Sequence, residues 1–488
     1  MRRFPFSLSL PQLPQLPPPP WPAPRRPALP ITTAAILLLL LIPALGLSRS
    51  PRPRAEGLEQ LMGTASLLQS FPPSPDRPLP ELWAQRFGRP LAERLWQQQR
   101  RPWWQFWGTH SEGAPYLAIS SLGFPGGPTS PLPPHALRVG DLIVVAPDPL
   151  SRQLLADRLR PQQRRSRGLQ RGCLQRLEQE QAVFWNPSAL GVIVGPVAPL
   201  LQRFQEGCVA LELEPGGLRW QGEAAAVDGV LTSAAALATR SQPLRTTLPS
   251  LPSDLLLELE GASLDQLLQG LLSRQLIRDP LASRYGLDES RLPLVRRAPF
   301  RLRLRPQASG PFQASLELQL AVGAQRREWE QVLLRLSRAL QEQGLAEAAP
   351  PVAAPPVATP PQPGSAALPR RAPAAPALAA TWSREDGVVV GGWRWLAAPG
   401  RAAQLLLFLG PPPQAAVPMG TATGELPAPG QVTLRVRPVA LDRLGLLPPE
   451  MPQLVRRSEQ LWLEAEPLAG VRQADPISQL KGRLEVAR

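Results

Sequence analysis

The chain has 488 residues, which gives room for about two to four domains. Hydrophobic residues make up 43% of it, so packed cores are expected. The 65 prolines gather mainly in two tracts, which predicts linkers rather than disorder throughout. The net charge is +15 and almost all of its cations are arginines, because Lys481 is the only lysine. Schiff-base and P-loop chemistry, which need a lysine, are therefore excluded for the chain before residue 481.

The segment 31–47 is uncharged, begins at Ile31 and ends at Leu47. As a helix it would be about 25 Å long, close to the short limit for crossing a bilayer. The sequence favours a single-pass signal anchor in the lipid bilayer, with the body on the extracytoplasmic side (periplasmic or lumenal). A cleaved signal peptide, with Ala44 and Gly46 before the cut, and a buried core helix are the alternatives.

Composition divides the rest of the chain. Residues 1–30 form a Pro/Arg-rich tail, and residues 48–80 a Pro-rich stalk. We expect a main α+β domain over 81–344, a disordered Pro/Ala linker over 345–380 and a mainly β segment with a short helix over 381–488. The predicted fold class is therefore α+β: one N-terminal transmembrane helix, then one or two domains of antiparallel amphipathic sheet with packed helices.

The clearest strand is 300–306, where Phe300, Leu302 and Leu304 alternate with arginines. Period two with one apolar face predicts a sheet with one buried and one wet side, and residues 313–322 are the expected partner. A helix over 328–343 follows, and Gly344 stands at its expected C-cap. Alternation on both sides of a Pro-Gly-Gly turn at 215–217 predicts a hairpin.

Three strand-then-helix stretches suggest internal repetition. They begin near residues 142, 254 and 432, and the second and third share a small residue followed by Leu-Asp. Unrelated strand-helix units share a similar sequence pattern, so the similarity has two interpretations, internal duplication and independent strand-helix units.

The two cysteines, Cys173 and Cys208, are too few for a disulfide framework. In an oxidising compartment they would be able to pair. We favour two small, buried and unpaired thiols.

A search for chemistry predicts no catalytic, cofactor-binding or metal site. The histidines, His110 and His135, have no partner at metal-ligand spacing. The acidic pairs 258/260 and 464/466 lie two residues apart on strands. We interpret them as the polar face of those strands, with nothing nearby to raise a pKa.

Two clusters are candidate contact sites. An arginine-rich stretch is a candidate for an anionic polymer or membrane surface, with a solvated loop as the alternative; its members are Arg158, Arg160, Arg164, Arg165, Arg167 and Arg171. The stretch 100–108 carries Trp103, Trp104 and Trp107 next to arginines. Such tryptophans suit a bilayer interface, but we favour a tryptophan-rich corner of the core.

The chain resembles uncharacterised cyanobacterial membrane-anchored proteins of unknown function. The resemblance rests on the anchor, the DLIVVAPDPLSRQLLADRL unit, the FWNP segment at 184–187 and the hairpin. The match covers roughly residues 81–344. The resemblance implies an envelope or thylakoid location, and it supplies no catalytic residues to carry over.

These observations favour a membrane-tethered, non-enzymatic binding or scaffold protein with a protein or lipid ligand. A hydrolase or transferase with a dispersed active site is the alternative. Binding of an anionic polymer through the arginine-rich loop is the third hypothesis, and export argues against nucleic acid.

Overall fold

The structure is a computed structural model. It describes residues 55–108, 113–124, 132–160, 169–189, 201, 203–226, 250–272, 274–308, 310–348, 379–396, 402–413, 418–419, 427–448, 451–468 and 477–486. Residues 54–488 form one compact unit, to which all of these belong.

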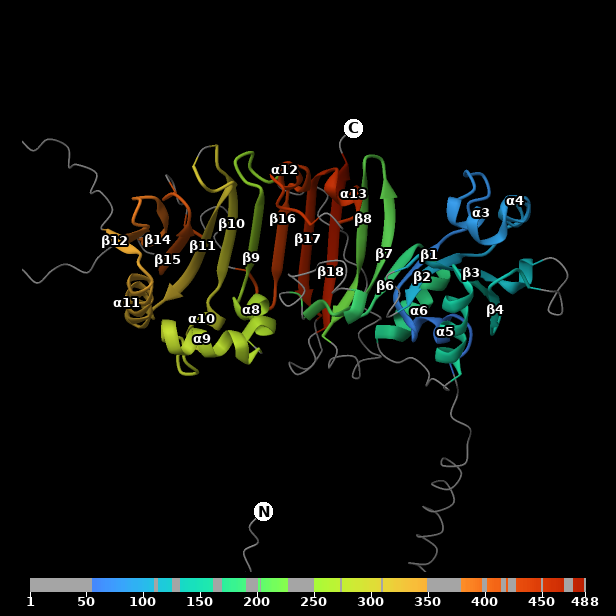
Figure 1. The fold of residues 1–488 in the computed structure, drawn as a ribbon, viewed down its shortest axis with the longest axis horizontal. Coiled ribbons are helices and arrows are strands. Elements are labelled where there is room, and N and C mark those ends of the chain that lie inside the picture. Colours follow the sequence, from blue (N-terminus) through green and yellow to red (C-terminus); the bar gives the residue numbers. More distant parts are fainter. Residues whose placement is uncertain are drawn as a thin grey trace, which may run out of the picture. The chain divides into compact units, whose positions relative to one another are not determined.

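Eighteen strands form one sheet. Their pairings give the order β4-β5-β3-β2-β1-β6-β7-β8-β18-β17-β16-β9-β10-β11-β15-β14-β13-β12, and all neighbours are antiparallel (Figure 1). The strands are β1 Ala65–Phe71, β2 Trp103–Gly108, β3 Tyr116–Ser120, β4 Ala136–Val139, β5 Leu142–Val145, β6 Ala182–Trp185, β7 Glu206–Glu214, β8 Gly217–Ala225, β9 Leu257–Gly261, β10 Phe300–Pro306, β11 Ala314–Gly323, β12 Ala346–Ala348, β13 Ala379–Ser383, β14 Val389–Leu396, β15 Ala403–Leu409, β16 Val432–Val436, β17 Ser458–Pro467 and β18 Ile477–Val486.

The described helices lie in the connections between strands, except the first of them, which precedes β1. They are α2 Leu58–Met62, α3 Glu81–Phe87, α4 Arg89–Gln97, the 3₁₀ turn η1 Ser121–Gly123, α5 Pro149–Leu159, α6 Leu169–Gln179, α8 Asp265–Leu272, α9 Gln275–Tyr285, α10 Leu292–Arg297, α11 Arg326–Glu342, α12 Pro438–Arg443 and α13 Gln453–Arg456.

The part of the sheet that holds β1 to β5 has helices on both faces. On one face α3 and α4 pack against Trp103, Ile119 and Ile143. On the other, α2, α5 and α6 pack against Trp104 and Val144. Since both faces are covered, β3 and β5 are apolar almost throughout, as the LIVV run of β5 predicts.

The part around β9, β10 and β11 is amphipathic instead. The apolar residues of these strands, Phe300 and Leu320 among them, pack against Trp329 and Leu333 of α11. The predicted strand at 300–306 and its partner are confirmed, with Leu302 opposite Leu318 and Arg303 opposite Glu317 in one register. The predicted helix is also confirmed as α11, and Gly344 behind it has a φ of 86°.

Four three-strand units recur along the chain: β1-β2-β3, β6-β7-β8, β9-β10-β11 and β16-β17-β18. First strands pair with each other in β1–β6 and β9–β16, and third strands pair in β8–β18. The second and third sequence repeats begin two of these units, since they contain β9 and β16. The first repeat contains β5, which pairs with β3 and β4 and begins no such unit.

The shared Leu-Asp has the same surroundings in the second and third repeats: the leucine is buried and the aspartate pairs with an arginine. Leu264 and Leu441 are both buried. Asp265 pairs with Arg296 and Asp442 with Arg456, in each case an arginine at the end of the last helix before the next strand. This equivalence favours duplication for these two units.

Three predictions about the layout need correction. The fold class is wrong, because the described residues form one 18-stranded antiparallel sheet rather than an anchor followed by one or two domains. The transmembrane, single-pass description is not supported: among the described residues no helix is long and apolar enough to span a bilayer, and segment 31–47 lies outside them. The predicted stalk is wrong for Ala65–Phe71, which is strand β1 inside the sheet.

Candidate binding sites

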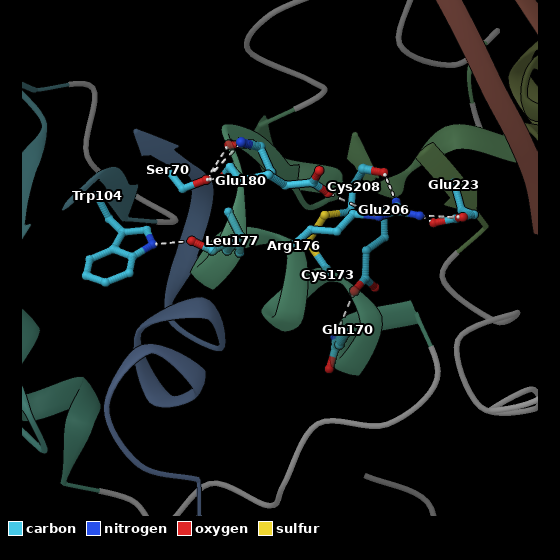
Figure 2. Close-up of a disulfide and its surroundings, with 11 residues drawn as sticks. Ser70, Trp104, Gln170, Cys173, Arg176, Leu177, Glu180, Glu206, Cys208 and Glu223 are labelled. Atoms are coloured by element: carbon cyan, nitrogen blue, oxygen red, sulfur yellow. Dashed lines mark hydrogen bonds and ion pairs between the residues drawn. A yellow bond between two sulfur atoms is a disulfide. The ribbon is translucent and has the colours of Figure 1, made fainter. Parts of the chain in front are cut away.

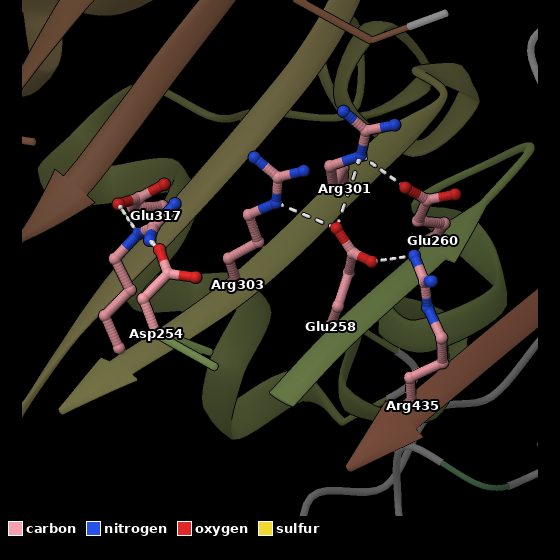
Figure 3. A network of polar contacts seen from close by, with 8 residues as sticks. Asp254, Glu258, Glu260, Arg301, Arg303, Glu317 and Arg435 are labelled. Atoms are coloured by element: carbon pink, nitrogen blue, oxygen red, sulfur yellow. Dashed lines mark hydrogen bonds and ion pairs between the residues drawn. The ribbon is translucent and has the colours of Figure 1, made fainter. Parts of the chain in front are cut away.

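A network of arginines and carboxylates covers the polar face of β9, β10, β11 and β16 (Figure 3). Glu258 lies at its centre, with only 3% of its side chain exposed. It accepts a hydrogen bond of 2.8 Å from Arg303 Nε and another from Arg435, and Arg301 Nε lies 3.9 Å away. Arg301 also pairs with Glu260.

The network continues onto β11, where Arg305 Nε donates to Glu317 at 2.7 Å. Period two brings these side chains to one face, and the antiparallel register sets Glu258 between Arg303 and Arg435. Each arginine has a carboxylate partner, so the face is neutralised from within. We interpret it as a structural network rather than as a site for a charged ligand.

Glu258 and Glu260 therefore form a polar face, as the sequence predicts. At the second acidic pair, Glu464 and Glu466, the prediction that nothing nearby raises a pKa was wrong. Burial raises the pKa of Glu464, and the neighbouring Glu466 carboxylate raises it further against the hydrogen bond from Gln431.

A cavity of about 270 Å³, here called the tryptophan cavity, lies beside β3 and the connection from α4 to β2. Its lining residues are Trp83, Leu95, Gln98, Gln99, Arg100, Arg101, Pro102, Ile119, Ser120 and Leu122. Trp83 packs edge-on against Trp96 and Trp103, with ring centroids 5.1 and 5.7 Å away. One wall of the cavity is thus backed by an aromatic cluster.

Two residues that line this cavity each have a buried polar atom without a described hydrogen-bond partner. These atoms are the indole Nε1 of Trp83, whose side chain is buried, and Oε1 of Gln99. Other indoles in this region do find acceptors: Trp96 Nε1 donates to Arg77 O and Trp104 Nε1 to Leu177 O, both at 2.8 Å. Trp103, in ring contact with Trp83, also has a buried Nε1 without a described acceptor, so the two indoles share this feature. A buried donor without an acceptor costs about 1–3 kcal/mol.

A second cavity, the acidic cavity, has a volume of about 310 Å³ and shares Arg101, Pro102 and Ser120 with the first. Glu56, Asp141 and Glu178 line it. Burial raises the pKa of Glu178, and the carboxylates of Asp141 and Glu59 raise it further. A general acid needs such a carboxyl, but it also needs a catalytic partner at a defined distance. The hydrolase or transferase alternative therefore stays a prediction.

Cys173 of α6 and Cys208 of β7 form a disulfide, with their Cα atoms 5.6 Å apart (Figure 2). The preference for unpaired thiols was wrong. Polar contacts from α6 surround the bond: Arg176 pairs with Glu223 at 2.6 Å, and Gln170 donates to Glu206 at 2.8 Å. Sequence reasoning missed the pair because the partners lie on different elements, 35 residues apart.

The candidate contact residues are only partly brought together. Arg164, Arg165 and Arg167 lie outside the described residues. Arg160 pairs with Asp157 just after α5, and Arg171 is exposed on α6, while Arg158 lies near the end of α5. The anionic-polymer hypothesis stays a prediction.

The three tryptophans follow the alternation of β2. Trp103 and Trp104 are both buried, on opposite faces of the sheet, and Trp107 is half-buried. Sequence reasoning grouped them with Arg100 but missed Trp83, which lies on helix α3. In the sequence, the tryptophan cavity was indicated only by Arg100, Arg101 and Pro102, which precede the tryptophans and line it.

Comparisons with known proteins add no relative. No protein-family model matches the chain, and neither a curated protein nor a solved structure matches it significantly. The resemblance to cyanobacterial anchored proteins stays a prediction.

Proposed function

We propose that this chain is a non-enzymatic binding protein of an extracytoplasmic compartment, and that it binds its ligand in the tryptophan cavity. The lining of the cavity carries the proposal, because Trp83, Leu95 and Ile119 lie there beside the polar side chains of Gln98, Arg100 and Arg101. Ligand sites commonly combine apolar walls with a few convergent polar groups, and this cavity has both.

The extracytoplasmic location is supported by the disulfide. Such bonds persist in oxidising compartments and are rare where thiols are kept reduced. We expect Cys173 and Cys208 to resist alkylation in denatured, unreduced protein taken from its native cells. Quantitative alkylation of both thiols would contradict the location and leave the cavity proposal untouched.

The binding proposal is tested by filling the cavity. Leu95 of α4 lines the cavity. Leu91 of the same helix packs against the same hydrophobic core but does not line the cavity. We expect 1-octanol, a probe with an apolar tail and one acceptor, to raise the melting temperature of the wild-type protein and of Leu91→Phe. Leu95→Phe should lose that increase. An equal increase in all three proteins would overturn the proposal.

A further inference from the structure

We infer that the ligand of the tryptophan cavity is a small amphipathic organic anion, with an apolar body in the cavity and one acidic group at its rim. This inference rests on the proposed function, since it names the chemical class of ligand for the same site.

The walls accept an apolar body. Trp83, Leu95 and Ile119 are nearly fully buried, and together with Pro102 they give the cavity an apolar lining. Leu122, on η1, also lines it although its residue is 70% exposed. A volume of about 270 Å³ lies just below the usual range for ligand pockets, so the body must be small.

The rim selects for negative charge. Arg100 and Arg101 line the cavity, and no Asp or Glu is among its described lining residues. Both arginines are exposed, and neither forms an ion pair with a described carboxylate. A guanidinium binds a carboxylate through two parallel hydrogen bonds, one to each carboxylate oxygen. A hydroxyl has only one acceptor oxygen and an ammonium has none, so neither can form this paired contact.

The arginines on the polar face of the sheet differ from Arg100 and Arg101 because they are paired with carboxylates. Arg301, Arg303 and Arg435 on the sheet face all have carboxylate partners. In the connection before β2 the backbone is held instead by local bonds: Gln99 Nε2 donates to Arg101 O at 3.1 Å, and Arg100 Nη1 donates to Gln99 O at 3.3 Å. These contacts hold the two guanidinium-bearing residues beside an apolar cavity, where an anionic amphiphile would complement both.

Arg101 also lines the acidic cavity, so its charge is shared with the carboxylates there. Arg100 does not, which makes Arg100 the more specific residue to change.

The test compares three probes with the same tail, octanoate, 1-octanol and octylamine, by calorimetric titration of the full chain at neutral pH. We expect octanoate to bind about tenfold more tightly than octanol, a difference of about 1.4 kcal/mol, because its carboxylate accepts charge-assisted hydrogen bonds. Octylamine should bind most weakly. Arg100→Gln should reduce octanoate affinity to nearly that of octanol and leave octanol binding unchanged.

Two controls make the result specific. Arg94→Gln changes an exposed arginine of α4 that does not line the cavity, and it should leave all three affinities unchanged. Trp83→Phe replaces the indole by a smaller phenyl ring and so reshapes the shared apolar wall, which should change the affinities for octanoate and octanol by the same factor.

The outcomes separate the two proposals. If octanoate, octanol and octylamine bind equally and Leu95→Phe abolishes all three, the cavity binds ligands and the anionic class is wrong. The class is also wrong if Arg94→Gln weakens octanoate as much as Arg100→Gln does. If none of the probes binds at millimolar concentration, or if Leu95→Phe leaves their binding intact, both proposals fail.

Discussion

At the scale of single residues, Glu258 and Glu206 show how the number and charge of the partners decide the cost of burying a carboxylate. Glu258 has three arginines within 4 Å, two from β10 and one from β16, and this number of partners offsets the cost of removing a carboxylate from water. Glu206 is the opposite case: its described partner is the neutral side chain of Gln170, so burial raises its pKa.

Glu258→Gln should be strongly destabilising, because it leaves the guanidinium groups of Arg303 and Arg435 half-buried without their counter-charge. We expect a loss of about 2–4 kcal/mol in the free energy of unfolding, measured by urea denaturation. Glu212→Gln removes an exposed carboxylate that lies 3.6 Å from Arg219, and it should cost less than about 1 kcal/mol. Equal losses in the two variants would show that Glu258 has no special role.

Glu206→Gln should stabilise the protein at neutral pH. Because the folded-state pKa of Glu206 lies above its ordinary value of 4.5, the wild-type fold loses stability as pH rises through 4.5 towards that higher value. Glutamine keeps an acceptor for Gln170 and carries no charge. The melting temperature of the variant should exceed that of wild type at pH 7, and the difference should vanish below about pH 4.5. A difference independent of pH would rule out titration of Glu206 as its cause.

At the scale of secondary structure, aromatic rings lie over glycines on neighbouring strands at three places. The pairs face each other directly: Trp185 and Gly207, Trp220 and Gly482, Phe408 and Gly392. A Cβ added to Gly482 would lie 2.2 Å from the ring of Trp220, and one added to Gly207 would lie 2.1 Å from Trp185. The rings occupy the space that a side chain would fill, so these glycines fix where the aromatic residues pack.

Gly482→Ala should therefore destabilise the β8–β18 pair by about 1–3 kcal/mol through overpacking. The same change in a Trp220→Ala background should cost much less, because the ring that it meets is gone. Urea denaturation of both single variants and the double variant measures this coupling. If the two changes are simply additive, Trp220 does not occupy the glycine's space.

At the scale of the whole molecule, the C-terminal strands complete the sheet formed by earlier ones. Strands β15, β16 and β18 pair with β11, β9 and β8 respectively. Without β16, β17 and β18, strands β8 and β9 would each lack a hydrogen-bonded neighbour, and exposed strand edges favour aggregation. The C-terminal segment is therefore integral to the sheet.

A protease site inserted between residues 348 and 379 tests this integration. After cleavage we expect the two fragments to elute together in gel filtration and to unfold in one cooperative transition. The fragment ending at residue 348, expressed alone, should aggregate, because it exposes the edges of β8, β9 and β11. Separate elution of two folded fragments would mean that the pairing between them does not hold the unit together.

Local sequence determined much of the secondary structure of this protein. The alternation at 300–306, the hairpin turn at Gly216 and the apolar stripe of α11 depend on neighbours within a few residues, so their periodicity and turn chemistry could be read directly. The register of Arg303 opposite Glu317 also follows from a nearby partner strand.

Only the tertiary structure decided which distant segments meet. The disulfide, the third arginine on Glu258, the placement of Trp83 beside Arg100 and the pairing of β8 with β18 all join residues from separate elements. Amphipathic strands with similar faces can pair in many orders, and local pattern does not distinguish among them. The order adopted is fixed by the packing of all eighteen strands and their helices together, which no single stretch of sequence specifies.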